Sequence, residues 1–503
     1  MKPTARLVLA VLLCALAAAP AGAQTASLTI LHTNDTHGHL LPFSAPEAAR
    51  QEIEGLPADR TVGGIARRAA LVERVRRDVR ARGGVVWLVD AGDYSDGSPF
   101  SITYKGEADV AAMNAAGYDL GTLGNHELNY PAEHTRRLIS LTKYQLLCAN
   151  LTDRTTGRSL LPAWTVRRVG PVRVGVFGLI TREAASYPAG KEAFSVGDEV
   201  EAARRVVGDL RGKVDVLVLL SHGGDRMDEE LARAVPEIDV IVGGHSHSRL
   251  ASGRFVARSE DLLVSDVNGT VIVQADHWGG ELGRLDLLFV RDDRGRWQVD
   301  RYRSRLIPVT SDIPEHPAVA AVVGQYWEPI AKTYGEVVGR ADGEFSSRGD
   351  DAAEYNLMAD AVREEFQADF DLENMGGVRA PLLRGPITRG DLATMDPFDN
   401  TVVRFEATGR QIREVLARHA PAVSGLRYRI EGGQVVEASI GGVALEDDRA
   451  YRGVTNSYFA GFALKGIPYE DTGRARLETL AAYIRRHGTI RPAYDGRRVV
   501  VLD

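Results

Sequence analysis

Short apolar runs and amphipathic helical stretches alternate along the first half of the chain. Apolar runs bounded by polar or glycine-containing turns predict buried strands. These runs cover residues 27–32, 85–89, 120–123, 146–149, 172–177, 214–220 and 240–243. Helical periodicity lies between them, for example over residues 64–82, and residues 271–274 and 282–290 indicate further strands that close the domain. This alternation predicts an α/β domain with a largely buried sheet.

The second half of the chain predicts a separate unit. A chain of 503 residues is too long for one ordinary core, so at least two domains are expected. We predict a first domain over residues 24–312, a linker helix over 313–336, and an α+β domain over 337–503. The last contains a helix at 356–366, a glycine-rich turn at 374–379 and a strand at 400–405.

Residues 1–23 have the pattern of a signal peptide. Lys2 and Arg6 precede an apolar stretch over residues 7–18, and the small residues Ala21, Gly22 and Ala23 suit a cleavage site. The alternative, a membrane anchor, is disfavoured because this stretch is too short to span a bilayer. We therefore expect a periplasmic or secreted protein. Its mature chain keeps one cysteine, Cys148, which allows no internal disulfide.

Composition limits the classes of partner. The chain is 44% hydrophobic and 26% charged, as in a globular protein, and its formal net charge is −7. No basic stripe indicates a nucleic-acid polymer as partner. An acidic enzyme can still bind a small anionic substrate when metal ions dominate the local field.

Five polar segments each follow a predicted strand. They are Asp35-Thr36-His37, Gly92-Asp93, Gly124-Asn125-His126-Glu127, Ser221-His222-Gly223-Gly224 and Gly244-His245-Ser246-His247, and together they use five of the 12 histidines. Ligands gather beyond the carboxyl ends of strands in α/β sheets, so one rim could collect these side chains. Each segment alone is a weak signal, and their combination predicts a metal site.

The residue types suit two divalent cations that lie close together. Such a pair needs a bridging carboxylate and a mixed oxygen and nitrogen shell. We expect Asp93 to bridge, with Asp35, His37 and His247 at one ion and Asn125, His222 and His245 at the other. The ions would polarise phosphoryl oxygens and lower the pKa of a bound water, so that hydroxide attacks phosphorus. The ligand set is compatible with Mn, Zn, Fe, Co or Mg.

His126 is expected to act outside the metal shell. It adjoins Asn125 but points elsewhere, so we predict that it binds a phosphoryl oxygen or protonates the leaving group. Glu127 is expected to orient a ligand or loop. The remaining histidines are predicted to be surface or capping groups: His32, His39, His134, His277, His316, His419 and His487.

The five segments resemble the motifs of calcineurin-like metallophosphoesterases. Residues 273–275, 282–285, 374–379 and 397–401 extend the resemblance to the secreted 5′-nucleotidases in that family. The resemblance implies a four-layer β-sandwich flanked by helices, followed by a C-terminal α+β substrate domain that rotates about the linking helix. It also implies two divalent metals and a nucleotide substrate, with Asn125, Asn374, Arg379 and Tyr458 in substrate binding.

Three features depart from the 5′-nucleotidase pattern. Asn129 stands where the family has an aspartate that orients the catalytic histidine, and this sequence is similar to the 2′,3′-cyclic-nucleotide phosphodiesterase/3′-nucleotidase branch. Leu464 also replaces an aspartate, and residues 420–425 contain no aromatic partner for Tyr458. Stacking on an aromatic contributes about 1–3 kcal/mol per base, so weaker nucleoside selectivity is expected.

Several hypotheses follow. The first is a 5′-nucleotidase-like phosphohydrolase, and its closest alternative is a cyclic phosphodiesterase/3′-nucleotidase. A third keeps the metal site but changes the ester, for example to a sulfur-linked substrate. A non-catalytic binding protein on the same scaffold would show eroded ligands, and none of the five segments is eroded.

Overall fold

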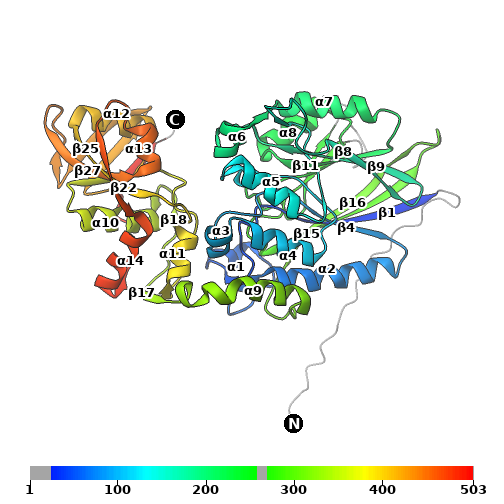
Figure 1. Ribbon diagram of the computed structural model, residues 1–503, viewed down its shortest axis with the longest axis horizontal. Coiled ribbons are helices and arrows are strands. Elements are labelled where there is room, and N and C mark those ends of the chain that lie inside the picture. The colour runs from blue at the N-terminus through cyan, green and yellow to red at the C-terminus, as the bar shows by residue number, and fades with distance from the viewer. Residues whose placement is uncertain (1–23, 258–268, 502–503) are drawn as a thin grey trace, which may run out of the picture.

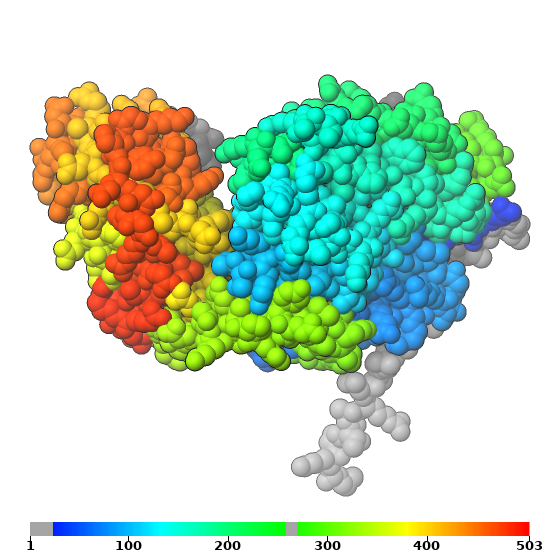
Figure 2. All heavy atoms as spheres, in the orientation of Figure 1, coloured from blue at the N-terminus to red at the C-terminus, as the bar shows by residue number. Residues whose placement is uncertain are grey.

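The computed structural model describes residues 24–257 and 269–501, and the predicted signal peptide lies outside this part of the chain. Two lobes lie side by side, and helix α9 (Pro317–Tyr334) runs along one side of the first lobe toward the second (Figure 1). In the space-filling view the lobes touch in their lower halves and are separated by a notch above (Figure 2). No helix among the described residues is long and apolar enough to cross a bilayer.

One six-stranded sheet of the first lobe has the order β16-β15-β1-β4-β5-β6. Strands β1, β4, β5 and β6 are mutually parallel, and β15 pairs antiparallel with both of its neighbours, β1 and β16. The strands are β1 (Thr25–Thr33), β4 (Val85–Asp90), β5 (Leu120–Gly121), β6 (Gln145–Leu146), β15 (Glu281–Arg291) and β16 (Trp297–Pro308).

The second sheet of this lobe also has six strands, in the order β13-β14-β12-β11-β9-β8. Its central strands β9, β11, β12 and β14 are parallel. The strands are β8 (Trp164–Val169), β9 (Val172–Ile180), β11 (Val216–His222), β12 (Val240–Val242), β13 (Arg254–Ala257) and β14 (Gly269–Val273). Short pairs flank the sheets: β2 (Pro42–Ser44) with β3 (Thr61–Gly63), and β7 (Leu151–Asp153) with β10 (Phe194–Val196).

The two sheets pack face to face and helices cover both outer faces. Inward-facing residues such as Ile30, Val218 and Leu285 form the core between the sheets. Helices α2 (Ile65–Arg80), α4 (Glu107–Ala116), α5 (Ala132–Leu141) and α9 cover the first sheet, and α7 (Glu199–Leu210) and α8 (Asp225–Ala234) cover the second. The remaining helices of this lobe are α1 (Ala49–Glu52), α3 (Pro99–Tyr104), α6 (Pro188–Glu192), η1 (His126–Leu128) and η2 (Arg182–Ser186). This four-layer sandwich confirms the expected fold class.

The second lobe is α+β. A five-stranded sheet has the order β23-β20-β27-β22-β28, beside a three-stranded sheet β21-β17-β29 and a four-stranded sheet β26-β25-β24-β30. The strands are β17 (Val337–Ala341), β18 (Ser347–Arg348), β19 (Asp351–Ala352), β20 (Phe370–Glu373), β21 (Gly385–Thr388), β22 (Thr401–Thr408), β23 (Ala422–Ser424), β24 (Leu426–Glu431), β25 (Gln434–Ile440), β26 (Val443–Ala444), β27 (Ala450–Asn456), β28 (Tyr469–Ala475), β29 (Thr489–Ile490) and β30 (Arg498–Val501). The helices are α10 (Ala353–Phe366), α11 (Arg389–Met395), α12 (Gly409–His419), α13 (Ser457–Ala463) and α14 (Arg476–His487).

A buried arginine holds the centre of the second lobe. Arg476 is fully buried, and its guanidinium donates to both carboxylate oxygens of Asp396 at 2.8 and 2.6 Å and to Glu373 at 2.5 Å. It also donates to the carbonyl of Gly377 at 2.9 Å. The arginine therefore joins β20, the turn over residues 374–379 and the end of α11.

Replacing Arg476 by methionine is expected to destabilise the protein by about 3–5 kcal/mol, because Glu373 and Asp396 would stay buried without a counter-charge. Urea unfolding at neutral pH measures this loss. The matched control is Arg410→Met, which breaks the exposed pair with Asp448 and should change stability by at most about 1 kcal/mol. Equal stability of the two variants would contradict the structural role of Arg476.

Candidate metal centre and active site

The candidate ligands follow strands of both sheets. Asp35 and His37 follow β1, Asp93 follows β4 and Asn125 follows β5, all in the first sheet. In the second sheet His222 ends β11, and His245 and His247 follow β12. The rim that we expect to collect these side chains is therefore formed where the carboxyl ends of the two sheets meet.

Several of these residues have a left-handed backbone, which non-glycine residues rarely adopt. They are Asp35 (φ 49°), His37 (φ 45°), Asp93 (φ 54°), His245 (φ 73°) and His247 (φ 54°). Hydrogen bonds between loops hold this geometry, since the amide of Asp35 donates to the carbonyl of Gly92 at 2.9 Å. Backbone strain that clusters in this way is typical of functional sites.

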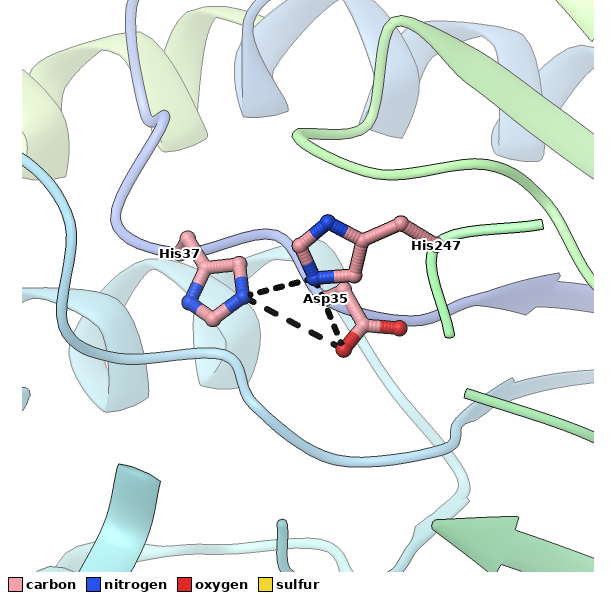
Figure 3. A group of neighbouring side chains, drawn as sticks. All are labelled: Asp35, His37 and His247. Atoms are coloured by element: carbon pink, nitrogen blue, oxygen red, sulfur yellow. Dashed lines mark hydrogen bonds and ion pairs between the residues drawn. The ribbon is translucent and has the colours of Figure 1, made fainter. Parts of the chain in front are cut away.

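One group of converging side chains consists of Asp35, His37 and His247, and Figure 3 shows the two rings and the carboxylate pointing toward one another. The Nε2 atoms of His37 and His247 lie 3.1 Å apart, and Nε2 of His247 lies 3.5 Å from Oδ1 of Asp35. The Nδ1 atom of His37 donates to the carbonyl of Asp96 at 2.7 Å. This bond leaves the lone pair of Nε2 free for a cation.

A second group consists of Asp93, His222 and His245, whose donor atoms lie within 4.8 Å of one another. Nε2 of His222 lies 3.1 Å from Oδ2 of Asp93 and 3.2 Å from Oδ1 of Asn125. Nδ1 of His222 donates to the carbonyl of Ala91 at 2.7 Å, so its Nε2 faces the group. Burial opposes a charge on this ring, but the carboxylates of Asp93 and Asp35 raise the pKa of His222 to about 10, so a cation that binds here would displace the proton from Nε2.

Asp93, a member of the second group, also approaches the first. Its Oδ2 atom is 3.1 Å from Nε2 of His222 and 3.9 Å from Nε2 of His37, and the residue is only 2% exposed. Burial lowers the pKa of His37 well below its usual value despite the charge of Asp93, which keeps the ring neutral, as a ligand must be. Two sets of oxygen and nitrogen donors around one buried carboxylate fit a pair of divalent cations.

His126 lies next to His37 of the first group and Asp93 of the second. Its Nε2 atom is 3.9 Å from Oδ2 of Asp93, and its Nδ1 atom donates to Oδ2 of Asp96 at 2.7 Å. It is 7% exposed, and its ring lines the cavities between the lobes. His37, Asp93 and His126 also form a third group of converging donors, at the side of the centre that opens toward these cavities.

Glu127 holds the surrounding turns. Its carboxylate accepts from the backbone amides of Asp93 at 3.0 Å, Gly124 at 2.7 Å and Ser95 at 3.0 Å, and from the Ser95 hydroxyl. Burial and the nearby charge of Asp93 raise the pKa of Glu127 to about 7. The residue thus fixes the loop that carries Asp93, in the orienting role expected for it.

Asn129, which occupies the position of the family's orienting aspartate, bonds to Asp96 and not to the imidazole of His126. Its side-chain amide donates to Oδ2 of Asp96 at 2.7 Å, the same oxygen that accepts from His126. The side chain of Asn129 is therefore linked to the ring of His126 through Asp96. Asp96 was missed, because its position three residues after Asp93 carries no motif that links it to residue 126.

The cavities next to the centre are lined by both lobes. A cavity of about 200 Å³ contacts His37, His126 and His247 from the first lobe and Arg379 from the second. A larger one of about 690 Å³ is lined by His126, Asn129, Tyr187, Asn374, Arg379, Tyr458 and Phe462, among others. In the described part of the chain no carboxylate pairs with Arg379. The predicted second-lobe residues Asn374, Arg379 and Tyr458 thus line the same cavity as His126.

Helix α13 presents two aromatic rings to the larger cavity. Tyr458 is 63% exposed and Phe462 is 37% exposed, and their ring centroids lie 5.4 Å apart. Phe459 is buried in the core, and Leu464 is buried as well. Phe462 was not predicted, although its spacing of four residues from Tyr458 on a helix would have placed both rings on one face.

The predicted surface position is wrong for two histidines. His32 is fully buried in β1, and His39 is 8% exposed and stacks on Trp278 at 4.4 Å between centroids. His277 in turn stacks on the candidate ligand His247 at 4.9 Å and lines the smaller cavity. A row of rings therefore supports one side of the centre.

Comparison with known proteins agrees with this geometry. The chain matches the family model of calcineurin-like phosphoesterases over residues 28–249 and that of the 5′-nucleotidase C-terminal domain over residues 337–465. It is 28% identical to a 5′-nucleotidase of Vibrio vulnificus, over 93% of this chain and 91% of that protein.

Solved structures show the same relationship. The 5′-nucleotidase precursor of Thermus thermophilus superposes with a TM-score of 0.83 at 28% identity, over 95% of this chain and 100% of that chain. The sulfate thiohydrolase SoxB of the same organism has the same fold, with a TM-score of 0.79 at 22% identity over 94% and 96% of the two chains. The chain therefore belongs to the calcineurin-like phosphoesterases that carry a 5′-nucleotidase C-terminal domain, a family of metal-dependent phosphoric ester hydrolases.

Proposed function

We propose that this protein is an exported hydrolase that releases phosphate from nucleoside 5′-monophosphates at a centre of two divalent cations. One observation carries the proposal: buried Asp93, a member of one group of donors, also approaches the other, beside cavities lined by both lobes. The residues that would hold the cations are Asp35, His37, Asp93, Asn125, His222, His245 and His247. Export rests on the signal-peptide pattern of residues 1–23.

The cations, when bound, would polarise the phosphoryl oxygens and make water a better nucleophile near neutral pH. The remaining chemistry belongs to side chains of this protein. Arg379 lines both cavities and would hold the phosphate with a positive charge from the second lobe. His126 lines both cavities, with Nε2 at 3.9 Å from Asp93, and would donate a proton to the leaving oxygen.

The larger cavity favours a substrate with a planar organic group. Tyr458 and Phe462 offer exposed rings, and Asn374 adds an amide at the same wall. Stacking contributes about 1–3 kcal/mol per base and does not depend on the identity of the base. These rings support a nucleotide rather than a sugar phosphate as substrate.

The alternative is a 2′,3′-cyclic-nucleotide phosphodiesterase with 3′-nucleotidase activity. The sequence around Asn129 favours it, because it is similar to that branch of the family. A non-nucleotide ester remains the third hypothesis, since the rings of the larger cavity come from one helix only.

A substrate panel tests these proposals. Phosphate release is measured from AMP, 3′-AMP, 2′,3′-cyclic AMP and ribose 5-phosphate, each with Mn, Zn, Co and Mg. We expect AMP to give the highest kcat/KM with at least one metal. Preference for 3′-AMP and the cyclic nucleotide would favour the alternative, and preference for ribose 5-phosphate would contradict both nucleotide hypotheses.

A further inference from the structure

Asp96 is a buried carboxylate in the turn after β4, and it contacts two residues of the segment around His126. Its Oδ2 atom accepts from Nδ1 of His126 at 2.7 Å and from the amide of Asn129 at 2.7 Å. The side chain is 3% exposed, so water competes little for these bonds. A carboxylate that accepts at Nδ1 keeps a proton there, so the ring atom left for the substrate is Nε2, which lies 3.9 Å from Asp93.

The backbone of the same residue supports the metal centre. The carbonyl of Asp96 accepts from Nδ1 of His37 at 2.7 Å, while its amide donates to the buried hydroxyl of Ser101 at 2.9 Å. The residue has φ 69°, and in this conformation its carbonyl contacts the ring of His37 while its carboxylate contacts the ring of His126. One residue thus fixes the orientation of a candidate metal ligand and of the candidate general acid.

We propose that Asp96 is the positioning residue of His126, and that Asn129 acts only by locking the carboxylate of Asp96. This inference rests on the proposed function. In the family the carboxylate partner of the histidine stands three residues after it, at the position of Asn129. Here the carboxylate comes from a loop that lies 30 residues earlier in the sequence than His126. The imidazole of His126 and that of the candidate metal ligand His37 are then both oriented by Asp96.

Asp96→Gly is the sharpest variant, because glycine adopts the positive φ of this position without strain and keeps the carbonyl that holds His37. Loss of a partner that orients a catalytic group typically costs about 10- to 100-fold in activity. We expect a fall of this size in kcat for AMP, with little change in KM and with bound metal unchanged. Asp96→Asn keeps an oxygen acceptor and should recover part of the rate.

A double-mutant cycle separates positioning from general damage. If Asp96 acts through His126, then Asp96→Gly should not slow His126→Ala any further, whereas an independent structural role would multiply the two losses. Asn129→Ala should lower kcat by about 2- to 10-fold, as for one hydrogen bond, and should have no effect in the Asp96→Gly background.

The outcomes also separate this inference from the proposed function. A wild-type protein that hydrolyses none of the phosphomonoesters would contradict the proposed function. An active wild type with a normal rate for Asp96→Gly, or with losses that multiply with His126→Ala, would overturn the inference alone. Metal loss from Asp96→Gly would assign the residue to the metal centre through His37 and would likewise overturn it.

Discussion

Replacement of Asp93 by asparagine is expected to lower kcat/KM more than about 1,000-fold and to release bound metal. Asp93 supplies the carboxylate that lies 3.1 Å from His222 and 3.9 Å from His37, so both groups of donors lose their shared anion. Metal ions contribute several kcal/mol to such reactions, and each 1.36 kcal/mol corresponds to a factor of ten. Asparagine keeps the shape of the side chain and tolerates the left-handed backbone at φ 54°.

The measurement pairs metal analysis after dialysis with phosphate release at saturating metal. Asp209→Asn, on the exposed face of α7, is the matched control and should leave both quantities unchanged. Chelation of the wild-type protein should reproduce the loss of activity, and added metal should restore the wild type but not Asp93→Asn. Full metal content together with full activity in Asp93→Asn would contradict the proposed bridging position.

Much of the candidate metal centre can be predicted from the sequence because its ligands follow directly after strands. Each metal-ligand segment follows an apolar run, and these runs occupy strands β1, β4, β5, β11 and β12. Two of the predicted strands are shorter in the structure, since β5 ends at Gly121 and β6 ends at Leu146. Beyond Gly121 the chain leaves the sheet to carry Asn125 and His126 to the centre, so apolar character continues after the strand has ended.

Contacts between segments that lie far apart in the sequence could not be predicted. The bond from His126 to Asp96 joins two loops, and nothing in the local pattern of either loop predicts the other. The sequence also does not predict that the ligands come from two sheets, because an apolar run is equally compatible with a strand of either sheet. His39 is a similar case: only the position of Trp278, far along the chain, shows that it is buried.

The second lobe was harder to predict for a different reason. Tyr458 and Phe459 are adjacent aromatic residues, and which of them faces the cavity depends on the rotation of α13. The structure buries Phe459 and exposes Tyr458 and Phe462. The amphipathic face of so short a helix is set by its packing on β22 and β27 rather than by its own sequence.

Replacement of His126 by alanine is expected to lower kcat for AMP by about 100- to 10,000-fold while metal content stays at the wild-type level. The ring donates through Nδ1 to Asp96, and Nε2 remains for the substrate. The variant therefore removes a proton donor without removing the carboxylates or imidazoles of the two groups of donors. Metal analysis and steady-state kinetics on the same preparation measure the two quantities.

The leaving group decides whether His126 acts as an acid. A ribose 5′-oxygen is a poor leaving group and needs a proton as its bond to phosphorus breaks, whereas 4-nitrophenolate leaves without one. His126→Ala should consequently slow AMP hydrolysis far more than hydrolysis of 4-nitrophenyl phosphate. Equal slowing of both substrates would assign His126 to binding of the phosphoryl oxygen, and loss of metal from the variant would place it among the ligands beside Asp93 and His37.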